Sequence, residues 1–393
     1  MQIYTFQPII LYRKLTADRI FDGIRFRSEG TVLITTPEGV VVDLVATEDA
    51  GDEVQVLQGM LSPGLINCHC HLELSHLKGK IPMHTGLIDF VKHIMGNREA
   101  EPEIIQQAIA EGEDEMLKNG IVAVGDICNN TSTIEQKKKQ RLHYHNFIEV
   151  SGFPPYVAES RFSKIKEVYD EFKASLRNNS IIPHAPYSVS IHLLKSIAEF
   201  EGNNILTMHN QEDEAENEFF IEGDGKFLEL YRSLNVDISF HKAAGKSSLQ
   251  QYLPNFPVQK NLLLVHNVHT DEADIQLASS CFESSPDHLF FCLCPNANLY
   301  IGGQLPNLEL FRKNNLQLVL GTDSLASNHQ LSIYAEIISL QNTFPQIPLE
   351  EMLKWATING ARALKIDDRF GSFEKGKQPG VVAVEEGRID LVI

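Results

Sequence analysis

The chain has 393 residues, and its 34 Lys and Arg against 52 Asp and Glu give a formal net charge of −18 at pH 7. A surface of that sign repels nucleic acid and anionic membranes, so we expect neither as a partner. Hydrophobic residues make up 43% of the sequence, enough to form a large buried core. No apolar run approaches the roughly 20 residues that span a bilayer.

The six cysteines indicate a reduced, cytoplasmic protein. The N-terminal residues MQIYTFQPII show no basic segment followed by an apolar stretch and a cleavage site, so we do not expect export. A chain of this length does not need disulfides, and no C-x₂-C pair indicates a cysteine-type zinc site. The cysteines are Cys68, Cys70, Cys128, Cys281, Cys292 and Cys294.

Both ends of the chain predict short β-strands. Near the N-terminus, TVLITTPEGVVVDLVA contains Val-, Ile- and Leu-rich runs separated by the turn signal PEG. After Gly371, the runs VVAVE and IDLVI have the same character. We therefore predict one small β-sandwich subdomain, built from residues 1–62 together with residues 366–393, beside a different domain over residues 63–365.

The middle of the chain alternates eight apolar runs with helical patterns such as EIIQQAIAEGEDEMLKN, which Gly120 closes. Continuous apolar strands separated by helices predict a parallel sheet covered on both faces. Eight such strands favour a (β/α)₈ TIM barrel. The alternative is a doubly wound open sheet, but no Gly-rich phosphate-binding turn follows the first run. The runs are GLINCH, IVAVGD, HNFIEV, SIIPH, ILTMH, NLLLVH, LFFCLC and LQLVLGTD.

Polar residues end most of these runs, where a barrel carries its reactive groups. A hydrophobic strand has no ordinary use for a histidine at its tip, yet four strands end in histidine and the last ends in aspartate. We therefore predict a functional site at this end of the strands. Its candidate residues are His69, His71, Asp126, His184, His209, His266 and Asp323.

Two H-x-H pairs occur, and their positions separate them. His69 and His71 close the first run, where strand alternation points both imidazoles to one face and toward one metal ion. His143 and His145 instead open their strand. We therefore expect the second pair at the opposite end of the barrel, in structural or surface roles.

The later strand ends predict a proton-transfer group beside the metal. Glu212 follows His209 by three residues, a spacing that places a carboxyl near a metal-bound water without ligating the metal. His266 ends its run and is expected to be functional, whereas His269 is assigned to the following loop. The acidic residues after Glu212 are predicted to form a solvated helix face; they are Asp213, Glu214, Glu216 and Glu218.

Asp323 ends the eighth run, where a carboxylate can ligate a metal and accept a proton from bound water. Three histidines and one carboxylate suit one divalent metal ion, Zn²⁺ or alternatively Fe²⁺, with a position left for water. No G-x-S-x-G motif is present, which disfavours a serine hydrolase.

Taken in order along nearly the whole chain, the motifs resemble those of the amidohydrolase superfamily. The closest branch contains mononuclear aminohydrolases that deaminate cytosine, guanine, S-adenosylhomocysteine and related heterocycles. The motifs are PGLINCHCHLELS, PHAPYSVS, TMHNQEDEAE, LVHNVHTDEADI, CPNANLYIGG and LGTDSLASN.

The resemblance implies a role for each candidate residue. It implies that one metal is held by His69, His71, His209 and Asp323, that Glu212 protonates a ring nitrogen of the substrate, and that His266 orients the hydroxide. Binuclear members usually carry a carboxylated lysine at the end of strand four. This chain has His184 there, so the resemblance implies a mononuclear site in which His184 contacts the substrate.

The same resemblance implies hydrolytic deamination of a small adenine-type heterocycle, with 6-aminodeoxyfutalosine of menaquinone biosynthesis first among the substrates. S-adenosylhomocysteine, methylthioadenosine and adenosine follow, and guanine or cytosine are further alternatives. A substrate carboxylate would need a basic partner, for which Lys78, Lys80 and Arg98 are candidates. Asn296 and Ala297 depart from the Arg-Ser or Thr-Ser of related deaminases.

Two other functions stay open on the sequence. One is a mononuclear hydrolase that opens a cyclic amide, such as an imidazolonase, and the other is a catalytically silent metal-binding protein. Retention of both Glu212 and Asp323 disfavours the second, because binding alone does not require a proton shuttle. A homo-oligomer is compatible with every one of these functions.

Overall fold

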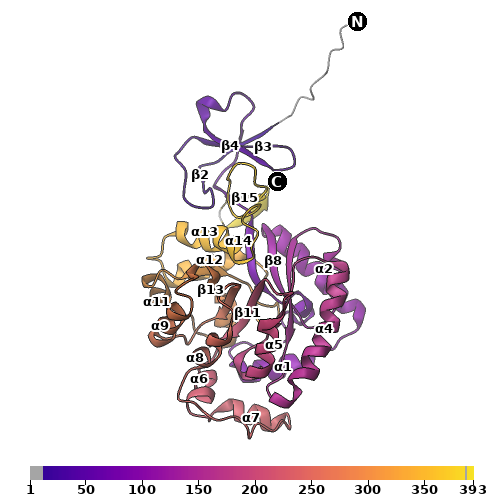
Figure 1. Cartoon of the computed structure of the whole chain (residues 1–393). Helices are drawn as coiled ribbons and strands as arrows, with labels where there is room; N and C mark the ends of the chain where they lie inside the picture. The colour runs from indigo at the N-terminus through magenta and orange to yellow at the C-terminus, as the bar shows by residue number, and fades with distance from the viewer. Residues whose placement is uncertain (1–11, 386) are drawn as a thin grey trace.

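The computed structural model describes residues 12–385 and 387–393. Figure 1 shows a small β-rich part, which contains β2, β3, β4 and β15, above a larger part in which helices surround strands. None of the described helices combines the length and the apolar character needed to cross a membrane. All six cysteines are free thiols.

The larger part is built on two parallel four-stranded sheets, in the orders β10-β9-β8-β7 and β11-β12-β13-β14. Every strand coincides with one of the eight apolar runs, because strands buried on both faces are apolar at nearly every position. The strands are β7 (Leu65–Cys70), β8 (Ile121–Cys128), β9 (His143–Val150), β10 (Asn179–Pro183), β11 (Ile205–Asn210), β12 (Asn261–His266), β13 (Leu289–Leu293) and β14 (Gln317–Leu320).

Backbone hydrogen bonds connect the two sheets on both sides. On one side, the amides of Thr322 and Asp323 each donate to the carbonyl oxygen of His69 at 3.0 Å, and Cys70 forms a parallel bridge with Asp323. On the other side, the His209 amide donates to the His184 carbonyl oxygen at 2.9 Å. These connections bring the ends of β7, β10, β11 and β14 together.

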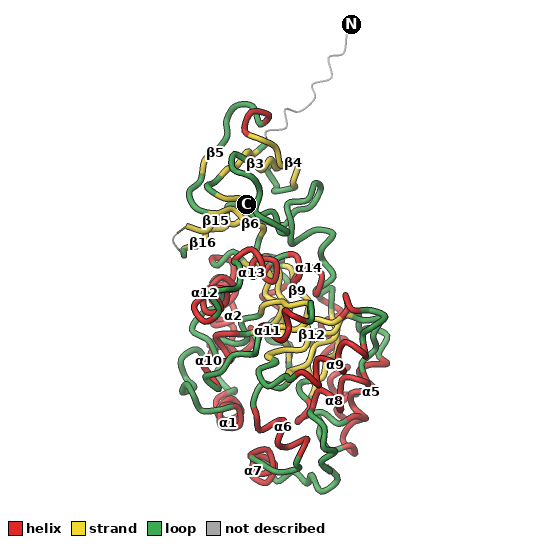
Figure 2. The backbone as a smooth tube through the Cα atoms, turned by 90° about the vertical axis from the view of Figure 1, so that its left-hand side faces the viewer, coloured by secondary structure: helices red, strands yellow, loops and turns green. Residues whose placement is uncertain are grey.

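Fourteen α-helices within the described residues accompany the strands, and in Figures 1 and 2 most lie on the outside of the sheets. Helix α2 ends as the sequence predicts, because Gly120 follows it in the left-handed conformation with φ 70°. The helices are α1 (Leu87–Asn97), α2 (Pro102–Lys118), α3 (Ile134–Lys137), α4 (Ala158–Ser175), α5 (Ile191–Glu199), α6 (Glu214–Ile221), α7 (Lys226–Ser233), α8 (Ser248–Tyr252), α9 (Glu272–Cys281), α10 (Pro295–Ile301), α11 (Leu308–Lys313), α12 (Ile333–Thr343), α13 (Leu349–Ala356) and α14 (Ile358–Ala363).

The small part consists of two four-stranded sheets, in the orders β4-β3-β1-β5 and β16-β15-β6-β2. Strand β15 pairs antiparallel with β6, so segments from both ends of the chain share one sheet. A separate apolar cluster that includes Leu15, Leu33 and Val381 is buried there. The strands are β1 (Arg13–Thr16), β2 (Arg19–Ile20), β3 (Thr31–Thr35), β4 (Val41–Ala46), β5 (Gln55–Val56), β6 (Met60–Pro63), β15 (Val381–Glu385) and β16 (Arg388–Leu391). Residues 1–11 of the predicted subdomain lie outside the described residues.

Candidate metal centre and active site

The ends of β7 and β14 bring two imidazoles and a carboxylate into contact. His69 Nε2 and His71 Nε2 lie 3.1 Å apart, and Asp323 Oδ1 lies 3.4 Å from the first and 3.3 Å from the second. Gly321 allows this approach, since a Cβ at that position would lie 2.7 Å from the Cβ of His69. The alternation of β7 therefore places both imidazoles on one face, as the H-x-H motif predicts.

His209 and His266 complete this group from the ends of β11 and β12. One donor atom each from His69, His209, His266 and Asp323 lies within 4.8 Å of every other. The ring centroid of His69 lies 4.9 Å from that of both His71 and His209. The structure thus brings together all five residues that the sequence assigns to the metal and the hydroxide.

Two of these residues have unusual backbone conformations. His266 has φ 75° and Asp323 has φ 56°, in the left-handed region that residues with a side chain rarely adopt. Such conformations persist only where the surrounding structure enforces them, and they cluster at functional sites. The turns that follow β12 and β14 therefore direct these two side chains toward the shared centre.

Neighbouring groups orient the candidate ligands. His209 Nδ1 lies 2.8 Å from the His184 carbonyl oxygen, and because a carbonyl only accepts, Nδ1 carries the proton and Nε2 keeps its lone pair. Ser327 donates its hydroxyl to Asp323 Oδ2. Asn298 Nδ2 lies 3.0 Å from His266 Nδ1. Both Ser327 and Asn298 lie within the sequence motifs, but nothing in the sequence assigned them these contacts.

Burial sets the charges of the group. It lowers the pKa of His71 to about 4 and the pKa of His266 to about 3, and it lowers the pKa of His209 well below its usual value. Burial alone would raise the pKa of Asp323, but a hydrogen bond with His69 and the neighbouring imidazoles lower it well below its ordinary value. At neutral pH the group therefore offers lone pairs from imidazoles and a carboxylate.

This donor set fits a divalent cation. Two imidazole nitrogens and a carboxylate oxygen lie within 3.1–3.4 Å of one another, and the buried Nδ1 atoms of His69 and His71 have no hydrogen-bond partner among the described residues. Imidazole nitrogen with a carboxylate oxygen is the ligand set that Zn²⁺ and Fe²⁺ favour.

Glu212 lies beside this group, just after β11. Its side chain is 7% exposed, and its Oε1 lies 3.6 Å from His266 Nε2. Burial, followed by the negative charge of Asp323, raises the pKa of Glu212 well above its ordinary value. A carboxyl that stays protonated at neutral pH can donate a proton to a substrate atom.

His184 and Glu149 form a second polar group on the other side of His209. A donor atom from each of Glu149, His184 and His209 lies within 4.8 Å of the others. His184 Nδ1 contacts the Ser188 hydroxyl at 2.6 Å. Glu149 accepts a hydrogen bond at Oε2 from Asn129 Nδ2 at 2.8 Å. Its buried Oε1 has no hydrogen-bond partner among the described residues and lies 3.7 Å from His209 Nδ1. The sequence signal for Glu149 is a carboxylate one residue before the end of an apolar strand.

Asp126 and Glu216 do not lie where the sequence predicts. Asp126 lies outside the metal group, because its carboxylate is held elsewhere: its Oδ1 accepts a hydrogen bond from the Leu72 amide at 2.8 Å. It forms a buried ion pair with Lys137 at 2.5 Å. The predicted solvated face of α6 is wrong at Glu216, which is fully buried and accepts a hydrogen bond from the Gln211 amide at 3.1 Å.

The remaining acidic residues and basic candidates have defined partners. Asp213 caps α6 by accepting from the Ala215 amide, while Glu214 and Glu218 are exposed as predicted. Among the basic candidates, Lys78 pairs with Glu115 at 2.8 Å. Arg98 bonds to Glu73 and, at 2.6 Å, to Asn129 Oδ1. Lys80 and His269 are absent from the metal group, and the His269 amide donates to the Gln211 carbonyl oxygen.

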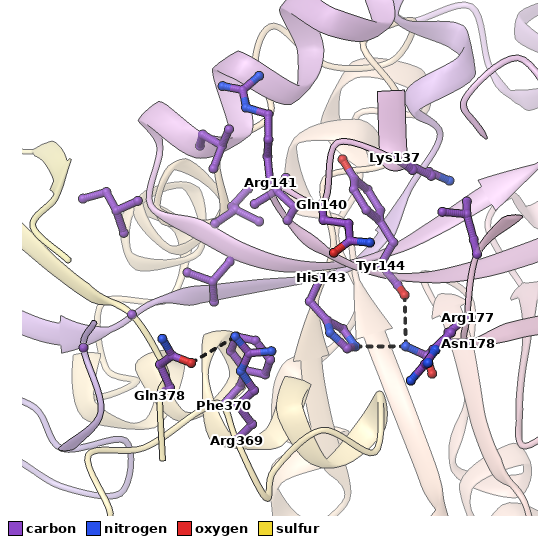
Figure 3. Close-up of a pocket in the computed structure, with 18 of the residues that line it drawn as sticks. Lys137, Gln140, Arg141, His143, Tyr144, Arg177, Asn178, Arg369, Phe370 and Gln378 are labelled. Carbon is purple, nitrogen blue, oxygen red and sulfur yellow. Dashed lines mark hydrogen bonds between the residues drawn. The ribbon is translucent and has the colours of Figure 1, made fainter. Parts of the chain in front are cut away.

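His143 and His145 lie at the start of β9, at the opposite end of the strand from Glu149. His145 is buried and contacts the Ser180 hydroxyl at 3.0 Å. His143 lines a cavity between the strand starts and the C-terminal segment, shown in Figure 3. Neither belongs to the metal group.

Comparison with known proteins shows the family. The model of the amidohydrolase family matches residues 60–392. An adenosine deaminase of Helicobacter pylori is 28% identical over 331 residues, covering 81% of this chain and 77% of the relative. A 5-methylthioadenosine/S-adenosylhomocysteine deaminase of Teredinibacter turnerae is 25% identical, covering 84% and 73%.

Among solved structures, the fold is similar to that of Helicobacter pylori aminofutalosine deaminase in complex with methylthio-coformycin. The two share 23% sequence identity and a TM-score of 0.80, covering 95% of this chain and 93% of the other. The fold and the family model agree over nearly the whole length, and this chain is a member of the amidohydrolase family.

Proposed function

We propose that this protein is a metal-dependent hydrolase that removes ammonia from an amino-substituted N-heterocycle of the adenine type. The observation that carries this proposal is the position of Glu212. It places a buried carboxyl with a raised pKa 3.6 Å from His266 and beside the group of His69, His209 and Asp323. The deaminase relatives support the same reaction.

One metal ion, Zn²⁺ or alternatively Fe²⁺, would be held by His69, His71, His209 and Asp323. When bound, it would lower the pKa of a coordinated water toward ~7 and so supply the nucleophile. His184 replaces the lysine of binuclear members, which supports a single ion. Glu149 does not supply a second complete site, because His209 Nδ1 already donates to a backbone carbonyl.

The chain's own residues then direct the reaction. Asp323 accepts a proton from the attacking water, and His266 orients that water. Glu212 donates its proton to the ring nitrogen next to the attacked carbon, so negative charge does not accumulate on that nitrogen. A new C–O bond forms, and the proton taken by Asp323 passes to the amino group, so that the C–N bond breaks and ammonia leaves. The remaining hydroxyl proton returns to Glu212, which leaves a carbonyl. His184 would contact the heterocycle.

The leading substrate is 6-aminodeoxyfutalosine, followed by S-adenosylhomocysteine, methylthioadenosine and adenosine. An aminodeoxyfutalosine deaminase relative supports the first of these substrates, and the adenosine and methylthioadenosine/S-adenosylhomocysteine deaminase relatives support the others. Guanine is less favoured, because His184 stands where guanine deaminases carry arginine. Lys78 and Arg98 already have acidic partners, so Lys80 is the remaining basic candidate for a substrate carboxylate.

We also propose the finer architecture. The backbone hydrogen bonds that connect the two parallel sheets on both sides support one closed (β/α)₈ barrel over residues 63–365. The pairing of β6 with β15, together with the separate apolar cluster, supports a small β subdomain from residues 1–62 and 366–393. Assembly into a homo-oligomer and a cytoplasmic location stay predictions from the sequence.

Ammonia release tests the proposed reaction. Purified, metal-loaded protein is incubated with a panel of adenine nucleosides, guanine, cytosine and cyclic amides. We expect ammonia from adenine-type compounds. Ring opening of an imidazolone without ammonia release would favour the cyclic-amide hydrolase, and binding without turnover of any compound would favour the catalytically silent protein.

A further inference from the structure

We propose that the protein has a second binding site, at the starting ends of β8, β9 and β10, for a small anion that carries phosphate or carboxylate groups. A cavity of about 700 Å³ lies there, between the strand starts and the C-terminal segment around Phe370 and Gln378 (Figure 3). A second cavity of about 740 Å³ adjoins it. Both volumes lie within the range of small-molecule sites.

The two cavities share lining residues and therefore form one connected region. They share two arginines, two side chains that hydrogen-bond to one another, and two apolar side chains. These residues are Arg177, Arg369, His143, Asn178, Leu176 and Phe370. The region lies at the opposite end of β9 from Glu149, so it is separate from the metal group.

The charge of this region is opposite to that of the whole chain. The net charge of the chain is −18, yet the charged side chains that line the two cavities are six basic and two acidic. A concave surface lined by one sign of charge concentrates counter-ions of the other sign. The basic residues are Lys137, Arg141, Lys173, Arg177, Lys365 and Arg369, and the acidic ones are Glu38 and Asp368.

Several of these basic groups have no acidic partner. Lys137 and Arg141 are already paired with carboxylates. Within residues 12–385 and 387–393, no ion pair involves Arg177, Lys365 or Arg369. The positive charge of these three side chains is therefore available to a bound anion.

Neutral groups between the arginines give the region a defined shape. Arg369 lies over the Phe370 ring at 4.9 Å and donates to the Gln378 Oε1 at 3.1 Å. The ring of His143 lies 5.4 Å from that of Phe370, and Asn178 Nδ2 donates to His143 Nε2 at 3.3 Å. His143 Nδ1 then carries the proton and is a further donor.

The chemistry of these donors favours phosphate and carboxylate. A guanidinium is planar and can donate two parallel hydrogen bonds to either group. Burial lowers the pKa of His143; the charge of Arg369 lowers it further, and that of Asp368 raises it. The occupant would contact strand starts and the C-terminal segment together, and so would stabilise their packing.

Titration calorimetry of the metal-loaded protein with inorganic phosphate tests the proposal, with thermal unfolding measured in parallel. The test variants are Arg177→Gln, Arg369→Gln and the double variant that carries both changes. The control is Arg161→Gln, which makes the same change at an exposed site near the start of α4, whereas Arg177 follows the end of that helix. Helix α4 has 18 residues, so its two ends lie about 27 Å apart.

We expect one phosphate per chain, bound at least 10-fold more weakly by the double variant and with unchanged affinity by Arg161→Gln. Phosphate should raise the melting temperature of the wild type and the control but not of the double variant. Without phosphate, the rate of ammonia release should be equal in the wild type, the test variants and the control. Absence of a binding signal in the wild type, or equal affinity in the double variant, would overturn the proposal.

Discussion

Replacing Glu212 with Gln tests the proposed reaction at its most informative residue. The change keeps the size of the side chain and removes only the acidic proton. Glu212 is outside the group whose donor atoms lie within 4.8 Å of one another, so the metal content should not change. General acid catalysis contributes roughly 10²–10⁴ in rate, which corresponds to about 2.7–5.4 kcal/mol of activation free energy.

The pH profile gives this prediction a second readout. Because burial and Asp323 raise the pKa of Glu212, the wild type should hold the carboxyl protonated at neutral pH. It should lose kcat as the pH rises through that pKa. Glu212→Gln should have a kcat lower by at least 10² and should lack this alkaline decline.

The assay is ammonia release under saturating substrate from pH 5 to 10, with metal analysis of each preparation. Glu214→Gln is the matched control, since Glu214 lies two residues away and is exposed. Its turnover should equal that of the wild type. Normal turnover in Glu212→Gln, with one metal per chain, would refute the role of Glu212 as the proton donor.

Three further predictions follow from the site and its surroundings. His209→Ala should lose most of its bound metal by elemental analysis, whereas His192→Ala, an exposed position on α5, should keep it. Ser327→Ala removes the hydrogen bond to Asp323 Oδ2 and should weaken metal affinity by about 10–100-fold in a chelator competition. Burial raises the pKa of Glu336 from 4.5 to about 8. Between these values Glu336 is therefore protonated in the folded state and ionised in the unfolded state, and its own contribution to stability should fall by about 3–5 kcal/mol as pH rises from 4.5 to 8. Glu336→Gln should flatten that slope in urea unfolding; an unchanged slope would contradict the assignment.

The eight strands could be predicted because each is buried on both faces and is apolar along its length. The position of the site followed from the same pattern, since His69, His209 and His266 interrupt apolar runs at their ends. At a parallel sheet, residues at the ends of separate strands lie together whatever their separation in the chain. This explains why residues from 69 to 323 could be assigned to one group.

Other parts depended on contacts that a linear pattern does not contain. Asp126 ends its run as Asp323 does, but its carboxylate accepts from the Leu72 amide and pairs with the buried Lys137, so it does not join the metal group. Glu216 belongs to an acidic stretch, yet it is buried because the Gln211 amide and the packing of α6 hold it inside.

The contacts of Asn296 also could not be predicted from the sequence. At this position the motif differs from that of related deaminases. Its side-chain amide donates to Glu336 at 3.0 Å, and its backbone amide donates to the same carboxylate at 2.8 Å. The residue is therefore committed to helix α12. Its difference from the related sequences accordingly says little about the substrate.

Anomalous diffraction from crystals of the metal-loaded protein, recorded across the zinc or iron absorption edge, tests the central claim most directly. We expect one strong peak per chain, about 2.0–2.2 Å from nitrogen atoms of His69, His71 and His209 and from an oxygen of Asp323. A peak elsewhere, two peaks of equal strength, or these four side chains without a shared ion would overturn the proposed metal centre.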